Sequence, residues 1–158
     1  MSSSISKTLQ TGSFAPDFVL KNQHNEIVRL SDYRNKKNVV LFFYPKDDTP
    51  GCTAEVKCFR DKYEQFTELG AEVIGISSDS IADHIKFADK HKLPYTLLSD
   101  HSGKVRELYG VSKTFFLIPG RMTFVIDKQG IIQYMFSSQF NPTKHIEESL
   151  AILQSISG

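Results

Sequence analysis

An unbroken apolar run of strand length, Val39-Val40-Leu41-Phe42-Phe43-Tyr44, constrains the fold of this chain more than any other feature. Successive side chains of a strand point to opposite faces, so an apolar run of this kind must be covered on both faces, as in the sheets of α/β proteins. The run stops at Pro45, and a polar loop then leads to Cys52. We therefore expect a central strand with the Cys52 loop at its carboxyl end, where open α/β sheets place their sites.

Helices and strands are expected to alternate after this strand. The predicted elements are a long helix over 52–69 that ends before Gly70, a buried strand over 71–77, a helix capped by Ser80, a short strand within 93–100 and a short helix over 102–109. The apolar side of the helix after Ser80 is predicted to be Ile81, Ile85, Phe87 and Ala88.

Two hairpins and a last helix complete the predicted fold. The hairpins join 14–20 to 27–30 and 121–127 to 131–136, and the last helix starts near Pro142 and packs through Ile146, Leu150 and Leu153. Ser31-Asp32-Tyr33 is predicted to form a helical turn. The pattern predicts an α/β fold: a mixed central sheet with helices on both faces and an N-terminal β-hairpin. One domain over residues 1–158 is expected, with 1–8 as a flexible tail.

The composition excludes several function classes. The net charge of +1, with 40% hydrophobic and 23% charged residues in 158, offers no electrostatic case for binding nucleic acid or a membrane. No apolar run approaches the roughly 20 residues that span a bilayer. Two cysteines do not make a disulfide framework, and no signal-peptide core follows Met1, so a cytoplasmic location is expected. A plastid location, for a chain trimmed from a longer precursor, is the alternative.

Cys52 is the residue with the most reactive setting. A thiol in the first turn of a helix faces unpaired N–H groups and the positive end of the helix dipole, which favours the nucleophilic thiolate. Pro45 could shield the thiol from water, Thr49 offers a hydroxyl, and Gly51 lets backbone N–H groups form an anion pocket. From composition alone, a loop whose residues merely satisfy turn geometry is the competing interpretation.

The segment Pro45-Lys46-Asp47-Asp48-Thr49-Pro50-Gly51-Cys52-Thr53 resembles the active-site signature of peroxiredoxins. Its context, including Phe59-Arg60-Asp61, residues 93–100 and Pro119-Gly120-Arg121, looks like the peroxiredoxin Q (bacterioferritin comigratory protein) subfamily. The resemblance runs from Phe14 to the last helix. It implies a thioredoxin-like fold and a thiol-dependent peroxidase acting on hydrogen peroxide and organic hydroperoxides, without metal or other cofactor.

The resemblance also implies roles for individual residues. Cys52 would be the attacking thiolate, Thr49 the hydroxyl that binds the peroxide, Pro45 the shield and Arg121 the catalytic arginine. A guanidinium near Cys52 would favour the thiolate and polarise the O–O bond. Arg60 is a second candidate cation, with a surface ion pair to a glutamate four residues further on as the alternative.

Cys58 departs from the family pattern, in which the resolving cysteine often lies at the position of Lys57. On a helix, a residue six positions after Cys52 is rotated by roughly 240° and lies about 9 Å further along the axis. A disulfide needs Cα atoms within about 7 Å, so the helix would have to unwind. Cys58 is therefore either a resolving thiol or a small core residue. The sulfenate formed on Cys52 would be recycled internally, or by thioredoxin, glutaredoxin or glutathione.

Other interpretations are weaker. A dithiol oxidoreductase would need a second cysteine at position 55, which is Glu. A peroxide sensor or holdase-like binding protein that uses the thiol stoichiometrically is the alternative function. The five histidines, at 24, 84, 91, 101 and 145, have no ligand spacing and are expected on the surface, as is the pair Asp47-Asp48. A monomer is expected.

Overall fold

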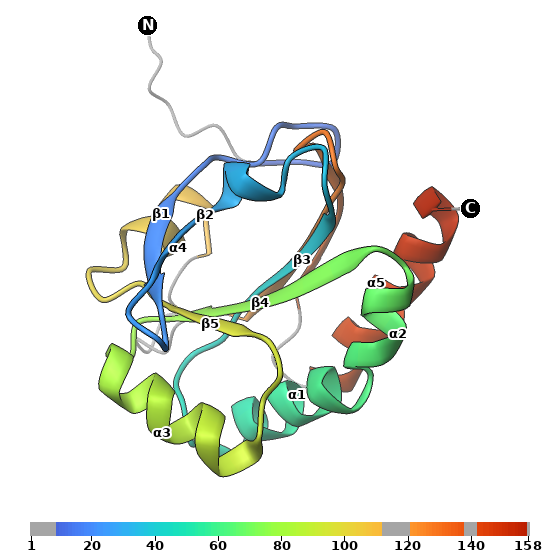
Figure 1. The fold of residues 1–158 in the computed structure, drawn as a ribbon. Coiled ribbons are helices and arrows are strands. Elements are labelled where there is room, and N and C mark those ends of the chain that lie inside the picture. The colour runs from blue at the N-terminus through green and yellow to red at the C-terminus, as the bar shows by residue number, and fades with distance from the viewer. Residues whose placement is uncertain (1–8, 112–120, 138–141, 158) are drawn as a thin grey trace, which may run out of the picture.

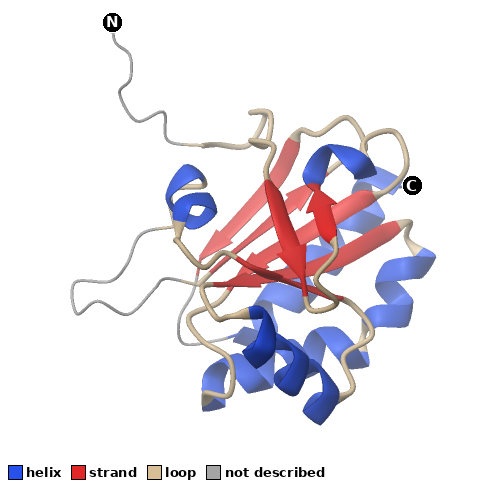
Figure 2. Ribbon diagram, turned by 60° about the vertical axis from the view of Figure 1, so that its left-hand side comes forward, coloured by secondary structure: helices blue, strands red, loops and turns tan. Residues whose placement is uncertain are grey.

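The computed structural model describes residues 9–111, 121–137 and 142–157. The described strands form one mixed seven-stranded sheet in the order β2-β1-β5-β4-β3-β6-β7 (Figures 1 and 2). The strands are β1 Val19–Asn22, β2 Ile27–Arg29, β3 Asn38–Phe43, β4 Ala71–Ser77, β5 Thr96–Ser99, β6 Met122–Ile126 and β7 Ile132–Ser137. Both predicted hairpins are present, because β1 pairs antiparallel with β2 and β6 pairs antiparallel with β7.

Strand β3 is buried along its whole length, as its unbroken apolar run predicts. It pairs parallel with β4 and antiparallel with β6, so it is an interior strand. The middle strand of the sheet is β4, and β3 lies next to it, so the prediction of β3 as the central strand was wrong by one position. In the antiparallel pairing Phe43 lies opposite Met122. The carboxyl end of β3 and the start of β6 therefore meet at one edge of the sheet.

Helices cover both faces of the sheet, as predicted, but unequally. Figure 1 shows the larger helices on one side: α1 Pro50–Asp61, α2 Tyr63–Glu68, α3 Ile81–His91 and α5 Pro142–Ser157. The other face carries α4 Lys104–Leu108 and the short 3₁₀ helix η1 Leu30–Tyr33. Alternate residues of β3 divide between two cores accordingly: Val40 and Phe42 pack towards α1, while Leu41 and Phe43 pack towards α4.

The helix predicted over 52–69 is two helices. It starts at Pro50 and breaks at Lys62, whose φ of −104° and ψ of 6° leave the helical region. Beyond the break, Tyr63 donates a hydrogen bond to Glu72 on β4, and Phe66 is fully buried. The helical periodicity continues through Lys62 in the sequence, so tertiary contacts override the local pattern here.

The predicted packing side of α3 was also wrong in one residue. Ser80 caps the helix as predicted, with its hydroxyl accepting from the N–H of Asp83 at 3.1 Å. Ile85, however, is 50% exposed, and the buried positions are His84 and Phe87. The stripe that faces the sheet thus includes a histidine, because the ring of His84 finds polar partners inside the protein.

The remaining elements follow the prediction closely. The last helix buries Ile146 and Leu153, and its neighbour Leu150 is partly buried against the same core. The tail predicted over residues 1–8 lies outside the described residues. Within the described part, no helix is long and apolar enough to cross a membrane.

Candidate active site around Cys52

Cys52 lies in the first turn of α1, beyond the carboxyl end of β3, where the sequence predicted it. Thr49 is the N-cap residue, with an extended backbone, and Pro50 occupies the first helical turn, where its missing N–H costs no hydrogen bond. The Cys52 side chain is only 1% exposed and is not in a disulfide. The thiol is therefore a desolvated group beside the N–H groups of a helix start.

Thr49 and Pro45 lie in the loop that leads from β3 into this turn. The Thr49 hydroxyl does not cap the helix, since it donates its proton to the carbonyl of Lys46 at 3.0 Å. With its proton engaged there, the hydroxyl oxygen is left as an acceptor for an incoming O–H group. Pro45 is half-buried directly after Tyr44. Both residues lie in the loop between β3 and α1, and their predicted roles at the thiol stay predictions.

Arg121 is brought to Cys52 by the register of the sheet. The pairing of Phe43 with Met122 places residue 121 beside the chain as it leaves β3. One guanidinium nitrogen, Nη2, donates to the Cys52 sulfur at 3.6 Å, and the other, Nη1, donates to Glu55 Oε1 at 2.5 Å. Burial lowers the pKa of Arg121, but the neighbouring Glu55 and Cys52 raise it by more, so Arg121 is a permanent cation here.

Glu55 is a site residue that was not predicted from the sequence, where position 55 served only to exclude a second cysteine. It lies three residues after Cys52, and residues at this spacing share one face of a helix, which is the signal that could have revealed it. Its side chain is completely buried. Burial raises the pKa of Glu55 to about 7, although the charge and hydrogen bond of Arg121 act in the opposite direction. Glu55 thus changes charge near neutral pH while bonded to the arginine that holds the thiol.

A second buried cation near Cys52 is Arg106, from α4, and not Arg60. Arg106 is 4% exposed, and its Nη2 donates to the Tyr44 carbonyl at 3.0 Å. Burial lowers the pKa of Arg106, and the charges of Asp100 and Cys52 partly oppose that effect. Arg60 instead bonds its neighbour Asp61 and the carbonyl of His91. Arg60 was predicted to be either a catalytic cation or the partner of a glutamate four residues further on. Its contacts correspond to neither prediction.

Two histidines expected on the surface, His84 and His145, are completely buried. On α5, His145 Nδ1 lies 2.6 Å from the Thr123 hydroxyl and 3.8 Å from Glu55 Oε2. Helical periodicity could have revealed this position, because residue 145 lies two turns before Leu153 on the packing side of α5. The expectation failed because a histidine was assumed to need water, whereas this ring is partnered inside the protein.

The other buried histidine anchors the loop before Cys52. Nδ1 of His84 lies 2.6 Å from Asp47 Oδ2, and Nε2 lies 3.0 Å from the carbonyl of Leu98. Asp47 also accepts from the Tyr44 hydroxyl at 2.5 Å, and its N–H donates to Asp79 Oδ2 at 2.8 Å. The prediction that Asp47 is a solvated surface residue was therefore wrong. Asp47 is 7% exposed, and both its carboxylate oxygens and its N–H have polar partners within the protein.

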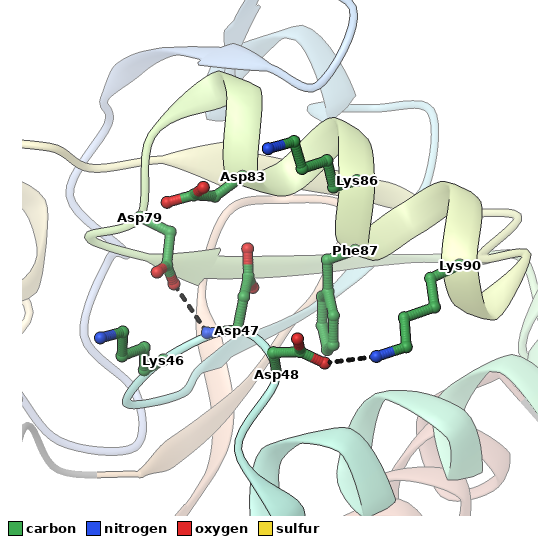
Figure 3. Close-up of a pocket in the computed structure, with 8 residues that line it drawn as sticks. All are labelled: Lys46, Asp47, Asp48, Asp79, Asp83, Lys86, Phe87 and Lys90. Atoms are coloured by element: carbon green, nitrogen blue, oxygen red, sulfur yellow. Dashed lines mark hydrogen bonds and ion pairs between the residues drawn. The ribbon is translucent and has the colours of Figure 1, made fainter.

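Three groups of this anchor, on Asp47, Asp79 and His84, place oxygen and nitrogen atoms within 4.8 Å of one another, as metal ligands would. These atoms are already hydrogen-bonded within the protein, and Asp79 Oδ2 also accepts from the Ser77 hydroxyl. A pocket of about 240 Å³ lies beside Asp47 and Asp79, and Figure 3 shows that its lining residues come from the loop and from α3 and the turn before it. Its lining is mostly charged and does not include Cys52, so the pocket is separate from the thiol.

Cys58 lies on the same uninterrupted helix as Cys52, since α1 runs from Pro50 to Asp61. It is partly buried at the edge of the core that α1 packs into. Burial raises its pKa, as do the nearby charges of Asp61 and Glu55. In this conformation the two thiols are not placed for a disulfide, because about 9 Å of helix separates them along the axis.

Comparisons with known proteins agree with this geometry. Residues 11–135 match the model of the AhpC/TSA family. Over 146 residues the chain is 52% identical to chloroplastic peroxiredoxin Q of Triticum aestivum, covering 92% of this chain and 67% of the relative. It is 51% identical over 154 residues to chloroplastic peroxiredoxin Q of Sedum lineare, covering 97% of this chain and 82% of the relative.

Solved structures give the same result. Peroxidoxin BcpB of Mycobacterium tuberculosis superposes with a TM-score of 0.88 at 38% identity, covering 94% of this chain and 98% of that one. Peroxiredoxin Q of Xanthomonas campestris superposes with a TM-score of 0.82 at 26% identity, covering 89% and 92%. These neighbours confirm the predicted thioredoxin-like α/β fold and the resemblance carried by Pro45–Thr53. The chain belongs to the AhpC/TSA family, in its peroxiredoxin Q branch.

Proposed function

We propose that this chain is a thiol-dependent peroxidase whose nucleophile is Cys52. Membership of the peroxiredoxin Q branch supports the peroxidase activity. The observation that carries the assignment to Cys52 is the hydrogen bond from Arg121 Nη2 to its sulfur, made inside a buried helix start. A fixed cation against a desolvated sulfur stabilises the thiolate, which is the form that attacks a peroxide.

The reaction assigns a task to each neighbour of the thiol. The thiolate attacks one peroxide oxygen, an S–O bond forms as the O–O bond breaks, and the other oxygen leaves with the electron pair and takes up a proton to become water or an alcohol. The Thr49 hydroxyl oxygen accepts a hydrogen bond from the O–H group of the bound peroxide. Arg121 donates a hydrogen bond to the oxygen on which negative charge develops. Pro45 limits the access of water. Cys52 is left as sulfenic acid.

Replacing Cys52 with serine tests this assignment. A serine hydroxyl is not ionised near neutral pH, so we expect no catalysed loss of hydrogen peroxide in the presence of a thiol reductant. Peroxide consumption would be followed with wild type, Cys52→Ser and Cys58→Ser side by side. Retained activity in Cys52→Ser would contradict the proposal. Consumption of a single peroxide per wild-type chain would point instead to a stoichiometric sensor.

An external thiol is the proposed reductant of the sulfenic acid, with thioredoxin, glutaredoxin and glutathione as candidates. The continuous helix between Cys52 and Cys58 supports an external route over an internal disulfide. Hydrogen peroxide and organic hydroperoxides are the proposed substrates. We further propose that the chain is a single domain that acts as a monomer.

The compartment is proposed from two separate observations. The composition favours the cytoplasm, whereas the matched relatives from Triticum aestivum and Sedum lineare are named chloroplastic, which supports the plastid alternative. Fractionation of the source cells with an antibody against this chain would decide between them.

A further inference from the structure

The buried side chains around Cys52 form a series that extends to the last helix. Arg121 bridges the Cys52 sulfur and Glu55 Oε1. The other oxygen of this carboxylate, Oε2, is buried and has no hydrogen bond. Nδ1 of His145 lies 3.8 Å from that oxygen. Four ionisable groups thus follow one another from the thiol to His145: two on α1, one directly before β6 and one on α5.

Several contacts inside the protein fix the position of the His145 ring. Its ring is completely buried, its Nδ1 lies 2.6 Å from the hydroxyl of Thr123, and the ring of Phe136 stands edge-on against it at 4.4 Å. Thr123 itself is 1% exposed. Burying a histidine beside a carboxylate is unfavourable unless their charges and hydrogen bonds compensate one another. From the sequence, His145 was expected to be a surface residue.

We propose that His145 is a positioning residue of the peroxidase site, which keeps Glu55 ionised so that the carboxylate fixes the Arg121 guanidinium against the Cys52 sulfur. Glu55 has one oxygen for Arg121 and one facing His145, so positive charge on the histidine stabilises the carboxylate from the side that Arg121 does not reach. A neutral Glu55 would hold the guanidinium less firmly, because the charge-assisted bond would be lost. The inference rests on the proposed role of Cys52.

Other charged groups also face Glu55, besides His145 on the side that Arg121 does not reach. Arg121, the residue before β6, faces it and remains charged throughout. Tyr95 and Cys58 also interact with its charge, but burial raises the pKa of both, so neither changes charge in this range. Burial raises the pKa of Glu55 itself to about 7, so a change in one neighbouring charge alters how much of it is ionised.

The decisive experiment is a double-mutant cycle with His145→Asn and Glu55→Gln. Asparagine can still hydrogen-bond Thr123 but carries no charge, so a role limited to holding α5 on β6 would be largely rescued. We expect His145→Asn to slow the oxidation of Cys52 by hydrogen peroxide roughly tenfold near neutral pH, less than the roughly 10²-fold cost of a 1 Å misplacement, because Arg121 keeps its charge. In the Glu55→Gln background the same substitution should have no further effect.

The pH profile supplies a second readout. Loss of a cation beside Glu55 raises the pKa of the carboxyl, so the acid limb of the oxidation rate should move to higher pH in His145→Asn. Thr123→Val, which removes the hydroxyl bonded to Nδ1, should shift it in the same direction. Leu153→Ala is the matched control, because it weakens the packing of the same helix without touching His145. It should leave the rate of the folded protein and its pH profile unchanged.

The outcomes separate this inference from the proposed function. A wild type whose Cys52 does not react with peroxide would overturn the proposed function. Two results would overturn only the role of His145, provided that the wild type reacts normally. One is an equal effect of His145→Asn in the wild-type and Glu55→Gln backgrounds, and the other is an unshifted pH profile of the oxidation rate in His145→Asn. A faster reaction in His145→Asn would overturn it as well, because the charge on Glu55 would then oppose the thiolate more than it positions Arg121.

Discussion

At the scale of single residues, the site depends on one side chain that serves two acceptors. Arg121 donates from Nη1 to Glu55 and from Nη2 to Cys52, and this needs the planar fork of a guanidinium. A lysine ammonium carries the same charge at one point and cannot reproduce both directions. Charge and geometry at the thiol can therefore be separated by one conservative substitution.

We expect Arg121→Lys to lower the rate constant for Cys52 oxidation by roughly 10²-fold, as for the loss of one fixed donor to a developing oxyanion. Competition with a thiol of known reactivity, followed by mass spectrometry, would measure it. Arg60→Lys is the matched control, because Arg60 is on the same helix as Cys52 but bonds Asp61 and His91. A lysine variant at 121 that reacts as fast as the Arg60 control would contradict the role of the fork.

At the scale of elements, α1 determines what happens to the oxidised sulfur. Cys52 and Cys58 belong to one continuous helix, and Cys58 is partly buried against the core. An internal disulfide would require the first turns of α1 to unwind, with loss of the packing of the residues between the two thiols, among them Val56, which is 0% exposed. The helix that prepares the thiolate therefore opposes its internal resolution.

We predict that Cys58→Ser retains most of the peroxidase activity when an external thiol is supplied. The intact mass of wild-type protein after one equivalent of peroxide gives the direct measurement. A gain of one oxygen is expected from a stable sulfenic acid. A loss of two hydrogens would mean that Cys58 forms an internal disulfide, and would reverse the prediction.

The loop between β3 and α1 is held by a buried acid and histidine. The carbonyl of Leu98 can only accept, so Nε2 of His84 donates to it, while Nδ1 lies 2.6 Å from Asp47 Oδ2. This pair joins the loop to α3 and β5. It explains how the polar loop that carries Pro45 and Thr49 is held in place.

Replacing His84 with leucine would leave the buried Asp47 without its main partner. We expect a loss of roughly 3–5 kcal/mol in the free energy of unfolding, the range found when one member of a buried pair is removed. Urea denaturation would measure it. Lys90→Leu, which breaks the exposed Lys90–Asp48 pair at the same pocket (Figure 3), should cost at most about 1 kcal/mol. Equal losses in the two variants would argue against the anchor.

At the scale of the whole molecule, the stability should depend on pH through Glu55. The pKa of this carboxyl is about 7 in the folded protein, compared with an ordinary value of 4.5, because burial disfavours its charge. Between these two pH values the unfolded chain has released the proton and the folded chain has not. The stability contributed by this group is therefore complete below 4.5 and is lost as the pH rises to about 7.

A rise of this size in the pKa of Glu55 corresponds to roughly 3 kcal/mol in the free energy of unfolding between pH 4.5 and about pH 7. Glu55→Gln has no proton to lose, so the difference in unfolding free energy between wild type and variant should change by about this amount across the window, with the wild type favoured at the acid end. Urea titrations of both proteins at a series of pH values would show it. Parallel stability curves would contradict the burial of an ionisable Glu55.

The sequence predicted the architecture better than it predicted the site. Apolar periodicity identified the strands, the hairpins and the last helix, because each of these patterns is local. Cys52 was identified by its place at a helix start together with the family motif, and Arg121 by the family resemblance alone. Glu55 and His84 were missed because their burial depends on partners 66 and 37 residues away, Arg121 and Asp47. A charged or titratable residue within a helical pattern indicates a surface position unless such a partner is known.

The pairing of Phe43 with Met122 has a consequence for changes in chain length. Side chains alternate between the faces of a strand, so one residue inserted between Arg121 and the paired part of β6 would turn the guanidinium towards the opposite face of the sheet. The turn over 128–130 lies beyond the far end of β6, and extra residues there would leave this alignment intact. Insertions and deletions should therefore be tolerated in that turn, and excluded by selection from the few residues that join Arg121 to the sheet.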